Sequence, residues 1–482
     1  MKCKTVVVNQ VWASVSSGLV LSGLITVWGY PAAALPQLSL PSAPLLTPSQ
    51  ASWFTSVPML ICVPGSVLGG ALTEQLGPRR LQLALSPVLA LAFLGMPAAA
   101  WAGPPESNFP LAILIFCRII QGLVVALLYP AVHIYPCEMA DPQRRGTLGS
   151  LIQVWASAGY LMCYILGHFL SWISLAVILP MVTILPGFIG LAMAHESPLW
   201  LARQGKTEKA REVLGCLRVS AEEISSAICA SVQAKNDRTH WQTLFQRPQR
   251  KMYFASILVS VMVFVMTQFT GQIVISANAV RIFQSAEVGL SPLLSSILVG
   301  TTRLTFCGMG SLLLYRVPRK TLLVVGNIVA GVALISVATF FFVQSRDYDT
   351  SGMNWLPLVS LMLYMVAFSI GIGPASSLLH VEVLPGPIRS VGSSVAATCF
   401  FASIFIVTKS FDDVEAALGL HSVFYAYSIG CIAFCILVIC LVPETKDRSL
   451  EEIENIWKLK YGEHFQTESS NQLLPKISKN LI

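Results

Sequence analysis

Two segments of the sequence place a glutamate and an arginine seven residues apart, at the border of long apolar runs. The segment "YPCEMADPQRRG" contains Glu138 and Arg145, and "HVEVLPGPIR" contains Glu382 and Arg389, 244 residues later. Opposite charges at such a border can pair in one conformation and separate in another, and this can shift a two-state equilibrium by about 1–3 kcal/mol. The alternative for a single pair is a positively charged membrane anchor with a solvated acidic neighbour. The duplication favours the conformational role.

The composition places these charges in a membrane protein. The chain has 482 residues, of which 54% are hydrophobic and 11% are charged, whereas a soluble chain carries about 25% charged residues. The net charge of +7 does not indicate a nucleic-acid partner, because the basic residues are scattered among short segments between apolar runs. Most of the 12 cysteines lie inside apolar runs without a C-x-x-C framework, so we expect small buried side chains and neither a metal site nor a cofactor.

Apolar runs of about 20 residues are long enough to cross a bilayer as helices. Twelve runs meet this standard, and the sequence therefore predicts an all-α integral membrane protein with twelve transmembrane helices. The expected spans cover residues 11–34, 52–75, 81–102, 110–138, 147–170, 173–194, 253–280, 292–315, 321–343, 356–384, 390–411 and 421–443.

The distribution of Lys and Arg sets the expected orientation. Most of the 31 basic residues fall in segments that lie on one side if both termini face the cytosol, and cytosolic segments are the ones enriched in Lys and Arg. We therefore expect cytosolic N- and C-termini. The predicted organisation is a six-helix half (1–194), a cytosolic helical linker (195–250), a second six-helix half (251–443) and a cytosolic tail (444–482).

The two predicted halves repeat each other's charged turns in the same order. A basic turn follows the second span of each half, as "LGPRR" (76–80) and "RVPRK" (316–320), and the Glu-x6-Arg pair follows the fourth span of each. Two related six-span units are typical of a transporter that exposes a central site to either side of the membrane in turn.

The motifs in these segments resemble those of the sugar porter branch of the major facilitator superfamily, especially its facilitative trehalose- and glucose-transporter-like members. The similar segments are "GGALTEQLGPRR", "RIIQG", "YPCEMADPQRRG", "HESPLWL", "GIGPASSLLHVEVLPGPIR" and "PETKDRSLEEI", and they cover nearly the whole chain. The sequence departs from the family pattern at two positions. Pro78 stands where the family usually has an Arg, and Tyr315 stands where it often has an acidic residue. The resemblance implies the major facilitator fold and solute transport, not an enzyme.

The resemblance also assigns roles to the charged residues. It implies a cytosolic gate that closes when the protein faces outward, formed by Glu138, Arg145, Glu382 and Arg389 together with Arg79, Arg80, Arg316 and Arg319. Glu196 and Glu444 are expected to tie the cytosolic helices to this gate.

The substrate site is expected near the midplane of the membrane, between the halves. Gln153 matches the sugar-contacting Gln of the family, and "TQFTGQIVISAN" in the seventh span keeps the family's Gln268 and Gly271. Other expected contacts differ from the family pattern, since Ile273 replaces an Asn. The complete set of expected substrate-binding residues is Gln153, Thr267, Gln268, Thr270, Gln272, Arg303, Phe368, Ser377 and Phe400.

Two arginines inside spans need separate explanations. Arg303, near the middle of the eighth span, costs at least about 2.5–3.5 kcal/mol to insert, so it either lines the cavity or bonds to backbone carbonyls. Proton-driven relatives carry an Asp in the first span beside the arginine of the fourth. The first span here, 11–34, has no acid to pair with Arg118, which favours passive transport.

These observations predict a facilitative, monomeric plasma-membrane transporter (uniporter) of a sugar such as a hexose, trehalose or a polyol. Arg303 and the altered pocket leave open a second solute class, such as an organic anion. A third hypothesis is a sugar sensor that does not transport, although the short tail after Glu444 offers little room for a signalling module.

Overall fold

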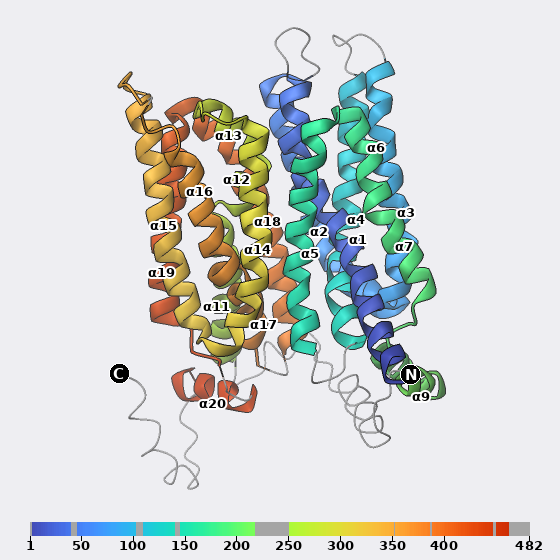
Figure 1. Cartoon of the computed structure of the whole chain (residues 1–482). Coiled ribbons are helices and arrows are strands. Elements are labelled where there is room, and N and C mark those ends of the chain that lie inside the picture. The colour runs from blue at the N-terminus through green and yellow to red at the C-terminus, as the bar shows by residue number, and fades with distance from the viewer. Residues whose placement is uncertain are drawn as a thin grey trace.

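The computed structural model describes residues 2–39, 46–102, 109–139, 145–216, 250–350, 352–385, 388–446 and 450–461. The described residues form helices joined by short turns, and Figure 1 shows them as two groups of roughly parallel helices. Residues 217–249 of the expected linker lie outside the described residues, as does the end of the tail.

The first group of helices contains the expected spans one to six. Its core is made by pairing α1 with α5 and α2 with α4, while α3 packs on α4 and α7 packs on α1. The elements are α1 (Lys2–Leu38), α2 (Pro48–Leu76), α3 (Pro78–Gly95), η1 (Met96–Trp101), α4 (Phe109–Met139), α5 (Arg145–Phe169), α6 (Trp172–Val182) and α7 (Ile184–Met193), followed by the short helices α8 (Pro198–Arg203) and α9 (Thr207–Cys216).

The second group contains spans seven to twelve. Helix α15 packs between α16 and α19, and α11 packs on α18. The elements are α11 (Arg250–Phe269), α12 (Gln272–Ala277), α13 (Ala279–Ser285), α14 (Pro292–Arg316), α15 (Arg319–Gln344), α16 (Leu356–Ala367), the π-helical turn η3 (Phe368–Ile372), α17 (Gly373–Glu382), α18 (Arg389–Leu418), α19 (Leu420–Leu441) and α20 (Leu450–Tyr461).

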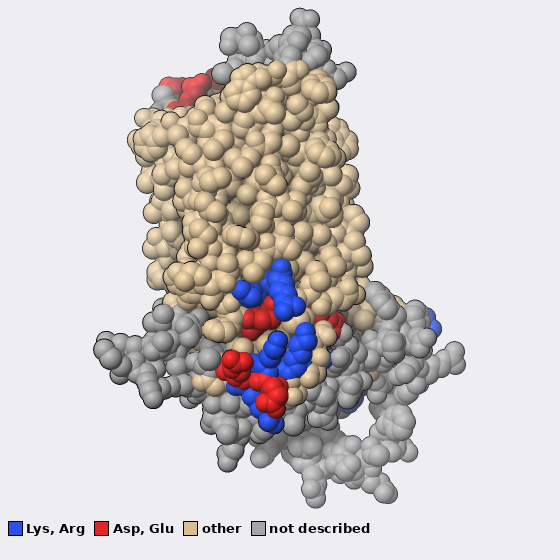
Figure 2. Space-filling model, turned by 90° about the vertical axis from the view of Figure 1, so that its right-hand side faces the viewer, with Lys and Arg blue, Asp and Glu red and all other residues tan. Residues whose placement is uncertain are grey.

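Eleven candidate spans among the described residues are long and apolar enough to cross a membrane. Helix α5 occupies the fifth expected span and is not among the eleven. The outer surface agrees with a lipid environment. Figure 2 shows a broad uncharged face between acidic residues at the upper edge and a larger group of Lys, Arg, Asp and Glu at the lower end of the view, where α9 lies. We call this the α9/α20 end, because Figure 1 places both helices there.

Several spans expected as continuous helices are interrupted. The sixth breaks at Thr183, between α6 and α7, and the tenth contains the π-helical turn η3. The seventh breaks after Phe269, where Gly271 adopts a left-handed φ of +84°. Backbone groups freed by such breaks need partners inside the protein, because lipid offers none. The Tyr364 hydroxyl of α16 supplies one by donating to the Thr270 carbonyl at 3.0 Å.

The two groups contact each other most extensively along two helix pairs, and α1 also contacts α12 and α13. Helix α2 packs on α18, and α5 packs on α14. Ser66 and Thr398 are hydrogen-bonded hydroxyls 3.1 Å apart across the first pair, and Tyr164 of α5 donates to the Ser276 carbonyl of α12 at 2.6 Å. The interrupted seventh span therefore lies directly against the first group of helices.

We expect Gly271→Ala to destabilise the protein by at least about 1 kcal/mol, because only glycine adopts this φ readily. An added Cβ would also lie 2.3 Å from the Tyr427 ring. Thermal unfolding of the purified protein in detergent tests this. Gly308→Ala in α14 is the matched control, because nothing lies within 4 Å of its added Cβ. Equal melting temperatures for the two variants would contradict the prediction.

Candidate functional site

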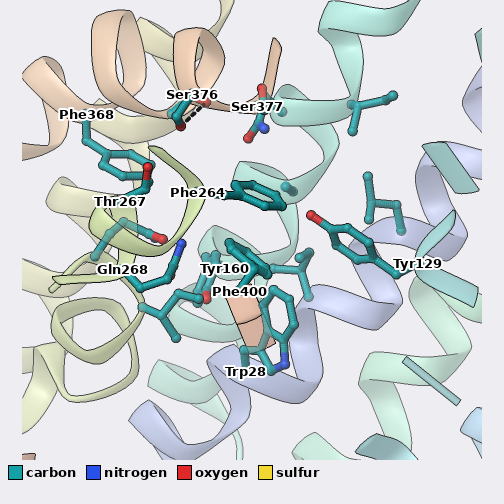
Figure 3. A pocket seen from close by; sticks show the side chains of 18 of the residues that line it. Trp28, Tyr129, Tyr160, Phe264, Thr267, Gln268, Phe368, Ser376, Ser377 and Phe400 are labelled. Carbon is teal, nitrogen blue, oxygen red and sulfur yellow. Dashed lines mark hydrogen bonds between the residues drawn. The ribbon is translucent and has the colours of Figure 1, made fainter. Parts of the chain in front are cut away.

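A cavity of about 650 Å³, counted with the space that continues into solvent, lies between the two groups of helices. Its lining comes from α1, α4 and α5 on one side and from α11, α12, α14, η3, α17 and α18 on the other (Figure 3). The lining residues are Leu21, Ile25, Trp28, Tyr129, His133, Ile152, Gln153, Ala156, Tyr160, Phe264, Thr267, Gln268, Gln272, Ile273, Arg303, Phe368, Gly373, Ser376, Ser377 and Phe400.

Aromatic side chains form much of the cavity wall. Phe264 and Phe400 stack with ring centroids 4.2 Å apart, and His380 stacks on the other side of Phe264 at 4.1 Å. Tyr129 of α4 lies against Phe400 from the opposite group of helices, with centroids 6.5 Å apart. Figure 3 shows the rings of Phe264, Phe400 and Tyr129 close together beside Trp28 and Tyr160. The wall therefore offers apolar faces to a ligand, and the polar groups of the cavity must set the orientation of that ligand.

The polar groups of the cavity are concentrated around the break in the seventh span. Gln268 precedes the break and Gln272 follows it, and both line the cavity. The amide of Gln272 donates to the Ser276 hydroxyl at 3.2 Å. Gln153 lines the same cavity from α5 of the other group. Amides carry both donors and acceptors, so this arrangement can bond a ligand with many hydroxyl groups from two sides.

The structure brings together all of the residues expected to bind substrate except Thr270. Thr270 is fully buried, and its hydroxyl donates to the Thr267 carbonyl at 2.8 Å. Since the Thr270 carbonyl accepts from Tyr364, this residue holds the helix break and is not part of the lining. Asn278, another polar residue of this span, donates its amide to the Val274 carbonyl at 3.1 Å.

Arg303 lines the cavity and is 7% exposed. Its guanidinium donates to the Ser276 hydroxyl at 3.4 Å and lies 4.6 Å from the centre of the Tyr160 ring. The ring of Phe368 is 6.0 Å away. Of the two explanations offered by the sequence, the structure therefore supports a cavity position.

Sequence reasoning missed several cavity residues of the first, fourth and fifth spans. Trp28, Tyr129, His133 and Tyr160 all line the cavity. Aromatic side chains are common throughout membrane helices, and their types alone do not show which face of a helix they occupy. The tertiary structure distinguishes them: the Trp28 and Tyr129 rings lie 6.4 and 5.5 Å from the Phe401 ring of α18, and Tyr160 lies beside Arg303 of α14.

A second cluster, at the α9/α20 end, contains the charged residues expected to form a gate. Glu196 follows α7 and accepts the backbone N–H groups of Arg79 and Arg80, at 3.1 and 3.2 Å, at the start of α3. Glu444 follows α19 and accepts the backbone N–H groups of Arg319 and Lys320, both at 3.1 Å, at the start of α15. Both carboxylates satisfy unpaired N–H groups at a helix N-terminus, where negative charge is favourable.

The glutamates that end the fourth and tenth spans are held in matching ways. Glu138 accepts from the Ser197 hydroxyl and pairs with Arg203 of α8. Glu382 accepts from the Thr445 hydroxyl at 2.6 Å and lies 3.8 Å from the Arg319 guanidinium. Each of these contacts joins elements of one half of the chain.

The remaining gate candidates have different surroundings. Arg79 donates from its side chain to the Leu191 and Ala192 carbonyls at the end of α7. The guanidinium of Arg389 donates to the Leu384 carbonyl at 3.2 Å, and the Arg316 carbonyl accepts from Lys446 at 2.9 Å. The side chain of Arg145, at the first residue of α5, lies outside the described part of the structure.

The electrostatic environment of Glu196 reflects its burial. Burial raises the pKa of its carboxyl above the ordinary value, while the N–H groups of Ser197, Arg79 and Arg80 oppose this shift. The contacts that offset the loss of hydration are therefore the same ones that hold α3.

Together, the two helix groups, the cavity between them and the duplicated charged clusters define a multi-pass membrane transporter. The chain matches the family model described as "Sugar (and other) transporter" over residues 19–457. It therefore belongs to this family, the sugar porters of the major facilitator superfamily, which are transporters and not enzymes.

Similar proteins of known name include facilitated trehalose transporters of insects. The chain is 31% identical over 416 residues to a Tret1-2 homolog from Drosophila simulans, covering 85% of this chain and 82% of the relative. It is 29% identical over 443 residues to Tret1 from Polypedilum vanderplanki, covering 92% and 86% respectively.

Solved structures with the same fold include the xylose transporter XylE from E. coli. Its inward-open conformation has a TM-score of 0.76 at 21% identity, covering 94% of this chain and all of the neighbour. A structure of this proton:xylose symporter bound to 6-bromo-6-deoxy-D-glucose has a TM-score of 0.73 at 22% identity, covering 92% and 99%. These likenesses confirm the predicted fold family.

We expect Glu196→Ala to destabilise the protein by about 1–3 kcal/mol, because it leaves buried N–H groups at the start of α3 without an acceptor. Thermal unfolding in detergent measures the effect. Glu208→Ala is the control, because the Glu208–Arg211 pair is largely exposed and such pairs contribute about 0–1 kcal/mol. The prediction fails if the two variants melt together.

Proposed function

We propose that this protein is a facilitative sugar transporter that moves a hexose, trehalose or a polyol across the plasma membrane by alternating access. In this proposal the chain has twelve spans and cytosolic termini, and a monomer is sufficient for transport. The observation that carries the proposal is the cavity, to which Gln153 contributes from one half and Gln268 and Gln272 from the other. The insect relatives named as trehalose transporters support a sugar as the solute.

The polar groups of the cavity suit a polyhydroxylated solute. Hydroxyl groups that leave water need replacement hydrogen bonds, and the three glutamines can supply them, whereas unpaired polar groups would each cost about 1–3 kcal/mol.

Alternating access is supported by how the two ends of the bundle are held. At the end opposite α9 and α20, Lys409 of α18 donates to the Ser52 hydroxyl of α2 at 3.0 Å and lies 5.2 Å from the Trp53 ring centre, which joins the two halves. At the α9/α20 end, Glu138 and Glu382 are each bound within their own half. Breaking the first set of contacts and forming charge pairs across the second would expose the cavity to the other side.

Passive transport is supported by the surroundings of Arg118. This residue is fully buried in α4 and donates to the carbonyls of Phe54 and Val27, at 2.9 and 2.7 Å, and to the Gln121 amide oxygen at 3.0 Å. These acceptors are uncharged and do not titrate. A buried acid beside an arginine is the usual carrier of a coupled proton, and α1 has none in residues 11–34.

The first test is uptake by the purified protein in liposomes, with labelled glucose, trehalose and a polyol. We expect Gln153→Ala to reduce kcat/KM at least about tenfold, because hydrogen bonds to the solute are lost on one side of the cavity. Gln284→Ala, an exposed position at the end of α13, is the control and should transport normally. No uptake of any solute, beside an active relative, would favour the sensor hypothesis.

The second test applies a pH gradient to the same liposomes. A uniporter only equilibrates its solute, so we expect the same final internal concentration with and without the gradient. Accumulation above the external concentration, driven by protons, would contradict passive transport. A proton-coupled relative reconstituted in parallel shows that the gradient is effective.

A further inference from the structure

Arg303 differs from every other residue that lines the cavity, because it carries a permanent positive charge. The lining contains neither aspartate nor glutamate. The cavity of the described structure therefore has an uncompensated positive charge on the α14 side, beside the break in the seventh span.

The contacts of Arg303 in the described structure are with uncharged groups. They are the Ser276 hydroxyl at 3.4 Å and the rings of Tyr160 and Phe368. A guanidinium offers five N–H donors in a planar fork that fits a carboxylate. One long hydrogen bond and two ring faces leave most of these donors without an acceptor among the described contacts of a side chain that lines the cavity.

Two other arginines show how this chain usually compensates such a group. Arg118, which lies outside the lining, donates to three uncharged oxygens at 2.7–3.0 Å. Arg281, at the end opposite α9 and α20, binds Asp412 at 2.7 Å and Glu415 at 2.6 Å. Arg303 has neither arrangement, although it is 7% exposed. A buried charge without a counter-charge is costly, and a solute that supplies the counter-charge removes this cost when it binds.

The groups around Arg303 indicate what else this solute carries. Gln272 shares the Ser276 hydroxyl with Arg303, so an amide lies beside the guanidinium. Gln153 and Gln268 line the same cavity and suit hydroxyl groups. A single arginine balances one negative charge, which fits a carboxylate better than a doubly charged phosphate.

We propose that Arg303 forms the anionic subsite of the cavity, and that the preferred solute is a sugar acid, a polyhydroxylated molecule with one carboxylate. This inference rests on the proposed sugar transport and specifies its substrate class. Uniport of such a solute moves one negative charge across the membrane with each cycle, so its rate must depend on the membrane potential.

The experiment compares glucuronate and gluconate with glucose and trehalose in liposomes that contain the wild-type protein. We expect kcat/KM to be at least about tenfold higher for the acids, since hydrogen bonds to charged groups are the strong class. An inside-positive potassium diffusion potential should accelerate glucuronate uptake and leave glucose uptake unchanged. This comparison requires no substitution and does not depend on the folding of a variant.

Substitutions then assign the effect to the residue. Arg303→Gln should lower glucuronate uptake at least about tenfold and change glucose uptake little, while Arg303→Lys should retain part of the acid preference because the charge remains. Arg346→Gln, in the exposed loop after α15, removes an arginine outside the cavity and should behave as the wild type.

Transport of glucose or trehalose without a preference for the acids would overturn this inference and leave the proposed sugar transport intact. An equal loss of neutral and acidic solutes in Arg303→Gln, at unchanged melting temperature, would also overturn it, because Arg303 would then serve both classes alike. No uptake of any solute by the wild type would overturn both proposals.

Discussion

The absence of water in the hydrocarbon layer is the constraint on which the rest of this structure depends. Every backbone and side-chain polar group at that depth needs a partner inside the protein. Continuous helices meet this requirement within themselves, and each interruption needs an added contact. The break at Thr270 is the example, because Tyr364 from α16 binds the carbonyl that the lost helical turn would have satisfied. The same interruption places Gln268 and Gln272 at the cavity.

The constraint also explains why the charges gather where they do. At the α9/α20 end, Glu196 and Glu444 each cap a helix with two backbone N–H bonds. This repetition in space follows the repetition in sequence, and it leaves Glu138 and Glu382 in equivalent positions. Because each is bound to a hydroxyl that follows the last span of its own half, a change of partner across the halves needs no new buried charge. This arrangement supports the proposed alternation between two conformations.

The same need for partners inside the protein has different consequences at two buried arginines. Arg118 is fully enclosed and bound to carbonyls, and it joins α4 to α1 and α2. Arg303 instead lies at the boundary between protein and cavity, against the face of Tyr160. A guanidinium in the first setting stabilises the packing of helices. In the second setting it can select what enters, because a ligand that completes its contacts gains what the protein does not supply.

Hydropathy and charge in the sequence determined the helical membrane class, the ranges of the expected spans and the duplicated charge pairs, because length and polarity are local properties. The motifs also indicated Gln153 and Gln268, and the polar or charged side chains inside the spans indicated Gln272 and Arg303. Sequence could not show that Thr270 turns toward Tyr364, or that Trp28, Tyr129 and His133 face the cavity. It also could not show that Arg303 has only uncharged partners. These properties depend on how each helix is rotated against its neighbours, and that rotation is set by contacts between residues far apart in the chain. Tertiary structure alone decides them.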